Sequence, residues 1–281
     1  MDLTSEQIGA LPELNAKLVV EITTRFLSDE LRKAGFQKAV LGLSGGIDSS
    51  VVAALAVRAL GANNVIGVMM PYRTSSPQST EDAVLLAAQI GLSTEKFDIS
   101  EMADGYLAKR SNLNDTRRGN VFTRCRMIVL YDFSAERNAL VLGTSNKTEL
   151  LLGYGTLFGD LASALNPIGD LYKTEIRQLA RFLDIPERII SKPPTADLWA
   201  GQSDETELGF SYDEVDRLLY HCVDLRFSGA QLVASGFSES LVTRVVERIR
   251  RNQFKRRGPL VCKLSPRSVT HDFLYPRDWG T

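Results

Sequence analysis

The chain has 281 residues, of which 44% are hydrophobic and 24% charged, and its formal net charge is -1. This balance is typical of a globule with a sizeable core, and it excludes a molecule that attracts nucleic acid or anionic membranes over its whole surface. The three cysteines are far apart and form no CxxC pair, so neither a disulfide framework nor a zinc site is expected. The first residues do not form a secretory leader and no apolar run could span a bilayer, so we expect a cytoplasmic protein without membrane or nucleic-acid partners.

Short apolar runs alternate with helical patterns along the first half of the chain. Residues 14–34 carry apolar side chains at helical spacing, which predicts a leading amphipathic helix that ends at Gly35. The predicted strands are 38–43, 65–71, 93–99 and 138–143, and the predicted helices between them are 47–60, 79–90 and 119–133. Three of these strands are almost continuously apolar, as buried parallel strands are. The pattern predicts an α/β fold: a doubly wound, mostly parallel sheet with flanking helices.

The remainder of the chain is predicted to be helical and rich in loops. Helical patterns cover 172–183, 212–223 and 239–253, and a polar, Pro- and Gly-containing stretch at 193–210 is interpreted as a lid loop. The segments on either side of this stretch are too short to be independent domains. We therefore expect one domain over 1–281, divided into an N-terminal helix at about 1–36, a nucleotide-binding core at about 37–192, and the lid loop with a helical part at about 193–281.

A glycine-rich turn follows the first predicted strand and opens the next helix. Its backbone N–H groups would point at an anion, and it lies at the sheet edge where α/β proteins bind ligands. The motif lacks the lysine of a Walker A loop, and the carboxylate of Asp48 would repel a bare polyphosphate unless Mg²⁺ lay between them. An ordinary turn at a helix start remains the simpler alternative. The candidate ATP-binding residues of this turn are Gly42, Leu43, Ser44, Gly45, Gly46, Ile47, Asp48 and Ser49.

Three further polar residues fall near the same edge of the sheet. Thr144 comes directly after the fourth predicted strand, and Glu149 follows as a possible second metal carboxylate, or as an exposed helix residue. Lys173 lies at the start of a predicted helix, where a cation opposes the helix dipole unless an anion is close. Either a phosphate or a neighbouring carboxylate, Asp170 or Glu175, would remove that conflict.

The motif SGGxDS resembles the PP-loop ATP pyrophosphatases, and longer stretches resemble the NAD synthetases of that superfamily. The matching stretches follow the family's order: LGLSGGIDSS, RGNVFTRCRM, LVLGTSNKTE, FGD, NPIGDLYKTE, ISKPPTADLWAGQSDETELGFSYDEVD and FKRRGPL. The resemblance implies an adenine nucleotide alpha-hydrolase-like fold and a ligase that adenylates deamido-NAD with ATP. Ammonia then displaces AMP to give NAD, and pyrophosphate is released in the first step.

The same resemblance implies roles for individual residues. The turn at 42–49, Thr144, Lys173 and Thr195 would contact ATP, and Asp48 and Glu149 would hold Mg²⁺. Asp160 would lie at the ammonia site, where a carboxylate could orient or deprotonate ammonium, and Lys173 would act in catalysis. The residues implied for deamido-NAD are Arg124 and Lys255.

The chain also departs from the family pattern. Leu157, Ala164 and Phe254 replace a lysine, an aspartate and a histidine that many ammonia-using members carry, which affects the expected dinucleotide contacts. Only about 37 residues precede the first strand, too few for the amidase domain of glutamine-dependent relatives, so free ammonia is the expected donor unless a separate amidase chain delivers it. The family further suggests a homodimer. The alternatives are another PP-loop adenylating amidotransferase, a tRNA-modifying enzyme or a non-catalytic nucleotide-binding regulator.

Overall fold

The structure is a computed structural model that describes residues 11–199 and 201–269. Its centre is a four-stranded parallel sheet in the order β3-β2-β1-β4. The strands are β1 (Lys38–Gly42), β2 (Val65–Met69), β3 (Ser93–Lys96) and β4 (Ala139–Leu142). From β1 the chain winds outward through β2 to β3 and then returns to place β4 on the other side of β1. The crevice of the sheet therefore lies between the carboxyl ends of β1 and β4.

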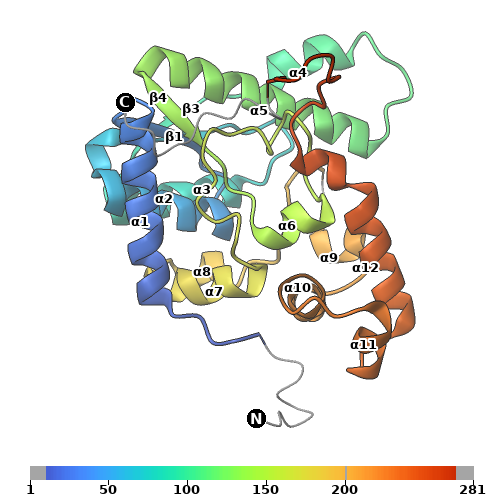
Figure 1. Cartoon of the computed structure of the whole chain (residues 1–281). Coiled ribbons are helices and arrows are strands. Elements are labelled where there is room, and N and C mark those ends of the chain that lie inside the picture. Colours follow the sequence, from blue (N-terminus) through green and yellow to red (C-terminus); the bar gives the residue numbers. More distant parts are fainter. Residues whose placement is uncertain (1–10, 200, 270–281) are drawn as a thin grey trace.

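Helices cover both faces of the sheet. In the view of Figure 1, α2, α3 and α7 lie below the sheet and α4 and α5 above it. Side chains alternate along β1, because Ala39 and Leu41 face the lower layer whereas Val40 faces the upper one. The bounds of these helices are α2 (Ile47–Leu60), α3 (Pro77–Ile90), α4 (Ser100–Leu107), α5 (Asp115–Arg137) and α7 (Lys173–Phe182). The leading helix of the chain is α1 (Ala16–Lys33).

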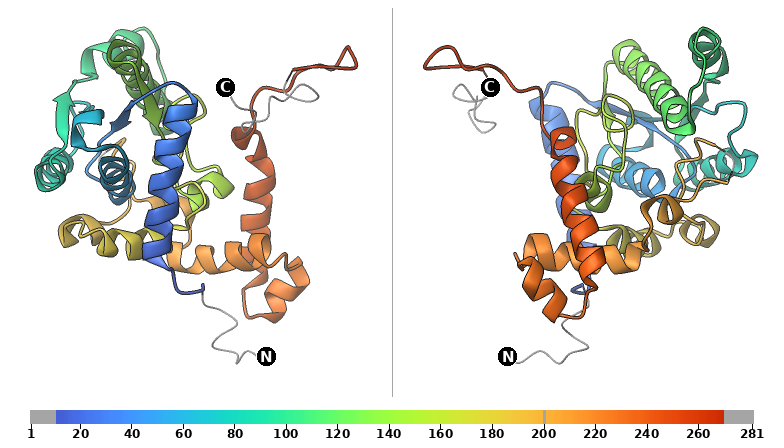
Figure 2. Two further views of the ribbon diagram at one scale, coloured as in Figure 1. Left: turned by 60° about the vertical axis from the view of Figure 1, so that its left-hand side comes forward. Right: turned by 90° about the vertical axis from the view of Figure 1, so that its right-hand side faces the viewer.

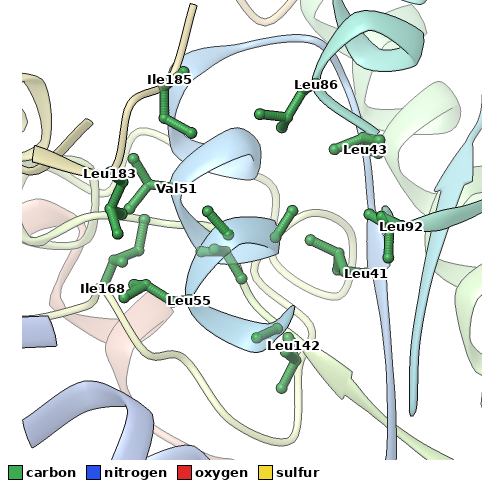
Figure 3. Packing of buried hydrophobic residues seen from close by; sticks show 14 of the residues in the cluster. Leu41, Leu43, Val51, Leu55, Leu86, Leu92, Leu142, Ile168, Leu183 and Ile185 are labelled. Carbon is green, nitrogen blue, oxygen red and sulfur yellow. The ribbon is translucent and has the colours of Figure 1, made fainter. Parts of the chain in front are cut away.

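The largest hydrophobic cluster lies between the sheet and the lower helices. Leu41 of β1 and Leu43, the residue that follows β1, pack against Val51 and Leu55 of α2. Figure 3 shows how the residues that follow α7 complete this cluster. The glycine-rich turn at 42–49, called the phosphate turn below after its expected role, therefore has a rigid base on both sides, because the strand before it and the helix after it belong to the same core.

A second cluster joins the C-terminal helices to the short helix after β4. Leu152 and Tyr172 pack with Tyr212, Val215 and neighbouring residues, so this part of the chain rests on the site-bearing elements. In Figure 2, α12 runs along one side of the molecule with α11 at its lower end. The elements are α6 (Lys147–Leu152), α8 (Glu187–Ile190), α9 (Asp204–Leu208), α10 (Tyr212–Leu219), a π-helical turn η3 (Tyr220–Asp224), α11 (Gly229–Ala234), α12 (Glu239–Arg251) and the 3-10 turns η2 (Ala62–Asn64) and η4 (Gln253–Arg256).

The predicted fold class and order of elements are confirmed, with local differences. The expected strand at 93–99 is shorter and fully exposed, as a polar edge strand can be. Helix α5 extends beyond 119–133 at both ends, and α4, α8, α9 and α11 are additional to the expected helices. Of the described helices, none has both the length and the apolar composition that crossing a bilayer requires.

Candidate active site

A cavity of about 500 Å³ opens at the carboxyl ends of β1 and β4. It brings together residues that are far apart in the sequence, since the phosphate turn, α5, the loop after β4, the start of α7 and residues 192–207 all contribute to its wall. Every candidate site residue from the sequence lines it except Gly45 and Arg124. The topology therefore gathers Thr144, Glu149, Asp160, Lys173, Thr195 and Lys255 around one space with the turn.

The phosphate turn is shaped by Gly45 and closed by hydroxyls. Gly45 has φ +73°, and a Cβ at this residue would lie 2.0 Å from the carbonyl oxygen of Ser79, so only glycine fits. The hydroxyls of Ser44 and Ser49 lie 3.0 Å apart, and the hydroxyl of Ser49 accepts the N–H of Ser44. The N–H groups of the first turn of α2, which have no partner inside the helix, remain for an anion in the cavity.

Asp48, Lys173 and Glu149 form a charged cluster on one wall. The Lys173 ammonium contacts the carboxylate of Asp48 and lies 3.6 Å from Oε1 of Glu149, and only 4% of the lysine side chain is exposed. Burial and the nearby Asp48 charge raise the pKa of Glu149 to about 8. Burial alone would lower the pKa of Lys173, but the two carboxylates outweigh it and raise that pKa. A site of this kind favours an additional cation.

The sequence offered the carboxylates of Asp170 and Glu175 as groups that could neutralise the charge of Lys173, and neither has that role. Asp170 pairs with Lys147 at 3.2 Å, and Glu175 accepts the N–H of Tyr172 at 2.8 Å as part of a capping box. The conflict between Lys173 and the dipole of α7 is removed by carboxylates from other elements instead.

Asn146 belongs to this cluster, although the sequence analysis did not single it out. Its side-chain amide donates to Oδ1 of Asp48 at 2.9 Å, and its side-chain oxygen accepts the N–H of Glu149 at 3.0 Å. The Glu149 carboxylate accepts the N–H of Asn146 in return. An Asn three residues before a Glu is a capping-box pattern, so this signal was present in the sequence.

Another part of the cavity wall carries the residues expected at the ammonia and dinucleotide positions. Oδ1 of Asp160 accepts the N–H of Thr156 at 2.8 Å, and the Lys255 ammonium donates to the carbonyl oxygens of Gly153 and Gly155. Arg126 also lines the cavity, with its Nε donating to the carbonyl oxygen of Met70 at 3.0 Å. Burial lowers the pKa of Arg126. This guanidinium, which the sequence analysis missed, faces the cavity from the middle of α5.

The predicted lid segment contacts the rim of the cavity. The Asp197 carboxylate accepts the N–H of Ser76 at 3.0 Å, which ties the segment to the start of α3. Leu198 and Trp199 pack against Gly119 of α5. At the base of the segment, Lys192 lies 3.1 Å from the buried carboxylate of Asp82. The segment is not entirely irregular, because it contains α9.

Several residues discussed from the sequence lie outside the cavity. Arg124 is exposed on α5 and donates to the carbonyl oxygen of Leu157 at 3.2 Å. Leu157, Ala164 and Phe254, which mark departures from the family pattern, do not line the cavity either. His221 is packed against Phe227 and Phe237, and His271 lies outside the described residues.

The carboxylates of Asp48 and Glu149 offer the hard oxygen ligands that Mg²⁺ prefers. Within 11–199 and 201–269 there is no group of three or more His, Cys, Asp or Glu side chains arranged to hold a metal ion. Magnesium typically completes its coordination with water and substrate phosphates, so two carboxylates beside a phosphate turn fit this ion. The donor set is compatible with a metal that is held jointly by the protein and a nucleotide.

Comparisons with known proteins agree with this geometry. Residues 19–259 match the sequence model of the family described as NAD synthase. A relative named NH(3)-dependent NAD(+) synthetase, from Chlorobium phaeovibrioides, is 55% identical over 267 residues, which is 95% of this chain and 96% of the relative.

Two solved structures are also similar. An NH3-dependent NAD synthetase from Campylobacter jejuni, in complex with nitrate, has a TM-score of 0.77 at 37% identity and covers 89% of this chain and 100% of its own. An NMN synthetase from Francisella tularensis has a TM-score of 0.79 at 30% identity and covers 89% of this chain and 99% of its own.

Proposed function

The chain belongs to the NAD synthase family, and we propose that the cavity at the β1–β4 crevice is where it carries out that family's reaction. The reaction is the ATP-dependent amidation of deamido-NAD to NAD with ammonia, which makes the chain a ligase that forms a C–N bond. The observation that supports the location best is the junction of a phosphate turn with the Asp48–Lys173–Glu149 cluster.

We propose that the triphosphate of ATP binds along the turn at 42–49. The N–H groups at the start of α2 and the ammonium of Lys173 would neutralise the phosphates, while Thr144 and Thr195 would contact the nucleotide from the other elements. Asp48 and Glu149 would hold Mg²⁺, which when bound neutralises phosphate charge and so favours departure of pyrophosphate. Arg126 faces the same space and is a candidate for a further phosphate or carboxylate contact.

The second substrate would approach from the wall that carries Asp160 and Lys255. Its pyridine carboxylate oxygen attacks the α-phosphorus of ATP, pyrophosphate leaves, and ammonia then attacks the carbonyl carbon and expels AMP. Asp160, at the cavity surface, would orient ammonium or accept its proton. None of these steps needs a serine, cysteine or histidine nucleophile, which agrees with the packed position of His221.

We also propose a homodimer whose dinucleotide site lies at the interface. This assembly would explain why Arg124, implied for deamido-NAD, is exposed and lies outside its own chain's cavity. A cytoplasmic location is proposed too, and the three free cysteines support it because such thiols suit a reducing compartment.

The assay that tests the function uses the purified chain with ATP, Mg²⁺, ammonium and either deamido-NAD or nicotinate mononucleotide. We expect NAD and AMP in equal amounts from the dinucleotide, and little product with glutamine in place of ammonium. Formation of ADP would reject cleavage between the α and β phosphates. A clear preference for the mononucleotide would instead assign the activity named for the Francisella tularensis structure.

A further inference from the structure

The N-terminus of α7 is occupied by a carboxylate from another helix. The first N–H groups of an α-helix have no partner within it. Here the N–H of Thr174 donates to Oδ2 of Asp216 at 2.8 Å, and the N–H of Lys173 donates to the hydroxyl of Thr148 at 3.1 Å. That hydroxyl donates in turn to Oδ1 of Asp216 at 2.5 Å. Asp216 of α10 therefore caps α7 both directly and through Thr148.

The same contacts connect the helices that carry the charged cluster. Thr148 precedes Glu149 on α6, and Lys173 is the first residue of α7. Asp216 and Thr148 are each 0% exposed, so water cannot replace these hydrogen bonds. A buried carboxylate is costly unless it is hydrogen-bonded, and the positive end of a helix dipole favours it further. Asp216 thus fixes the backbone of Lys173 relative to α6.

This arrangement also changes how α7 can meet a phosphate. Two of its first N–H groups are already bonded to Asp216 and Thr148, so these two amides are not free to bind an anion. What α7 presents to the cavity is the Lys173 ammonium, on a side chain that is 4% exposed and reaches Asp48. The position of this charge depends on the position of the first turn of α7.

We propose that Asp216 is a positioning residue for ATP binding: it holds the first turn of α7 against α6 and thereby places the Lys173 ammonium beside the phosphate turn. The inference rests on the proposed contact between Lys173 and ATP. Without the carboxylate, the N–H of Thr174 and the buried hydroxyl of Thr148 lose their acceptor, and the backbone of Lys173 is free to shift. A small displacement of a charged contact is enough to weaken binding and catalysis strongly.

The first test compares two aspartates of the same helix. Asp216→Asn removes the charge without changing the shape, whereas Asp213→Asn makes the same change at a side chain that is 73% exposed and pairs with Arg177. Calorimetry with a non-hydrolysable ATP analogue should show about tenfold or more weaker binding for Asp216→Asn, as is typical when an outer residue that orients a ligand is lost. Asp213→Asn should bind like the wild type. Wild-type affinity in a folded Asp216→Asn protein would overturn the inference.

A double-mutant cycle separates positioning from a general structural effect. If Asp216 acts through Lys173, then adding Asp216→Asn to Lys173→Met should weaken analogue binding little further. Fully additive losses would mean that Asp216 does not act through the lysine. If Lys173→Met binds the analogue like the wild type, the proposed ATP contact is wrong and this inference falls with it. If Lys173→Met binds weakly but Asp216→Asn binds normally, only the inference is overturned.

A second pair of variants applies even where Asp216→Asn does not fold. Thr148→Val keeps the shape of the side chain and removes the hydroxyl that links Lys173 to Asp216, whereas Thr148→Ser keeps the hydroxyl. We expect the Ser variant to bind the ATP analogue several-fold more tightly than the Val variant. The two variants should have equal melting temperatures, so that the difference in affinity does not come from a difference in folding. Equal affinities for the two would contradict the proposed link.

Discussion

Asn146 shows how an uncharged side chain can orient two carboxylates at once. Its amide donates to Asp48, and its backbone and side chain exchange hydrogen bonds with Glu149. The residue is 0% exposed, so no water molecule can take over these contacts. The two proposed metal ligands come from elements that are about a hundred residues apart, and Asn146 is the direct hydrogen-bonded bridge between them.

We therefore expect Asn146→Ala to reduce activity more than stability. Loss of an N-cap costs about 1 kcal/mol of folding free energy, and loss of a residue that orients metal ligands lowers activity by about tenfold or more. The matched control is Asn15→Ala, because Asn15 caps α1 by accepting the N–H of Leu18 at 3.1 Å and does not line the cavity. Melting temperatures and kcat/KM for ATP would be measured for both. Equal kcat/KM values in the two variants would contradict a role for Asn146 beyond capping.

At the scale of elements, the lid segment and α5 are fitted to each other at Gly119. A Cβ at this residue would lie 2.8 Å from Cδ1 of Leu198 and 3.4 Å from the ring of Trp199. The absence of a side chain on α5 thus allows the lid to lie against it. Since an acyl-adenylate is hydrolysed by water, a segment that covers the cavity would protect the intermediate.

The substitution Gly119→Ala should loosen this contact. We expect faster chymotryptic cleavage within 196–208, less protection by ATP analogue and deamido-NAD, and more AMP released per NAD formed. Alanine is favoured over glycine in a helix by about 1 kcal/mol, so weaker folding would not be the cause. Gly105→Ala in α4 is the control, because a Cβ there meets nothing within 4 Å. Identical cleavage and coupling in the two variants would remove support for the lid.

The sequence predicted the elements and site residues whose signals are local, and it missed those that depend on tertiary placement. The turn at 42–49 was predicted to open a helix because SGGxDS is contiguous, and it does so. Helix α5 was predicted too short because its caps, Asn114 and Asn138, were not recognised. Arg124 and Arg126 stand two residues apart and so point about 200° apart around the helix. Which of them faces the cavity depends on how α5 packs. The contacts of Asp216 were equally hidden, because they join three helices.

Considered as a whole molecule, the chain carries a stripe of exposed side chains along α5. Arg124, Ile128 and Tyr131 recur at helical spacing on α5, and Ile128 and Tyr131 are 53% and 42% exposed. Two large apolar side chains beside an arginine are typical of an interface in which the arginine reaches a partner. The stripe is therefore the surface on which we expect the proposed homodimer to form, with Arg124 reaching the partner's cavity.

Mixing two inactive variants tests this arrangement. Asp48→Asn should abolish turnover by weakening metal binding, and Arg124→Ala should abolish it at a low deamido-NAD concentration by weakening binding of that substrate. If Arg124 serves the cavity of the other copy, a mixed dimer contains one site with both native residues, so reassorted dimers should recover up to about a quarter of wild-type activity. If Arg124 serves its own cavity, every site of the mixture lacks one residue and no activity returns.

Sedimentation of Ile128→Glu should show monomers under conditions where the wild type is dimeric, because a buried charge would oppose association. A wild-type monomer in that experiment, or a mixture that stays inactive although mixed dimers form, would rule out the shared site.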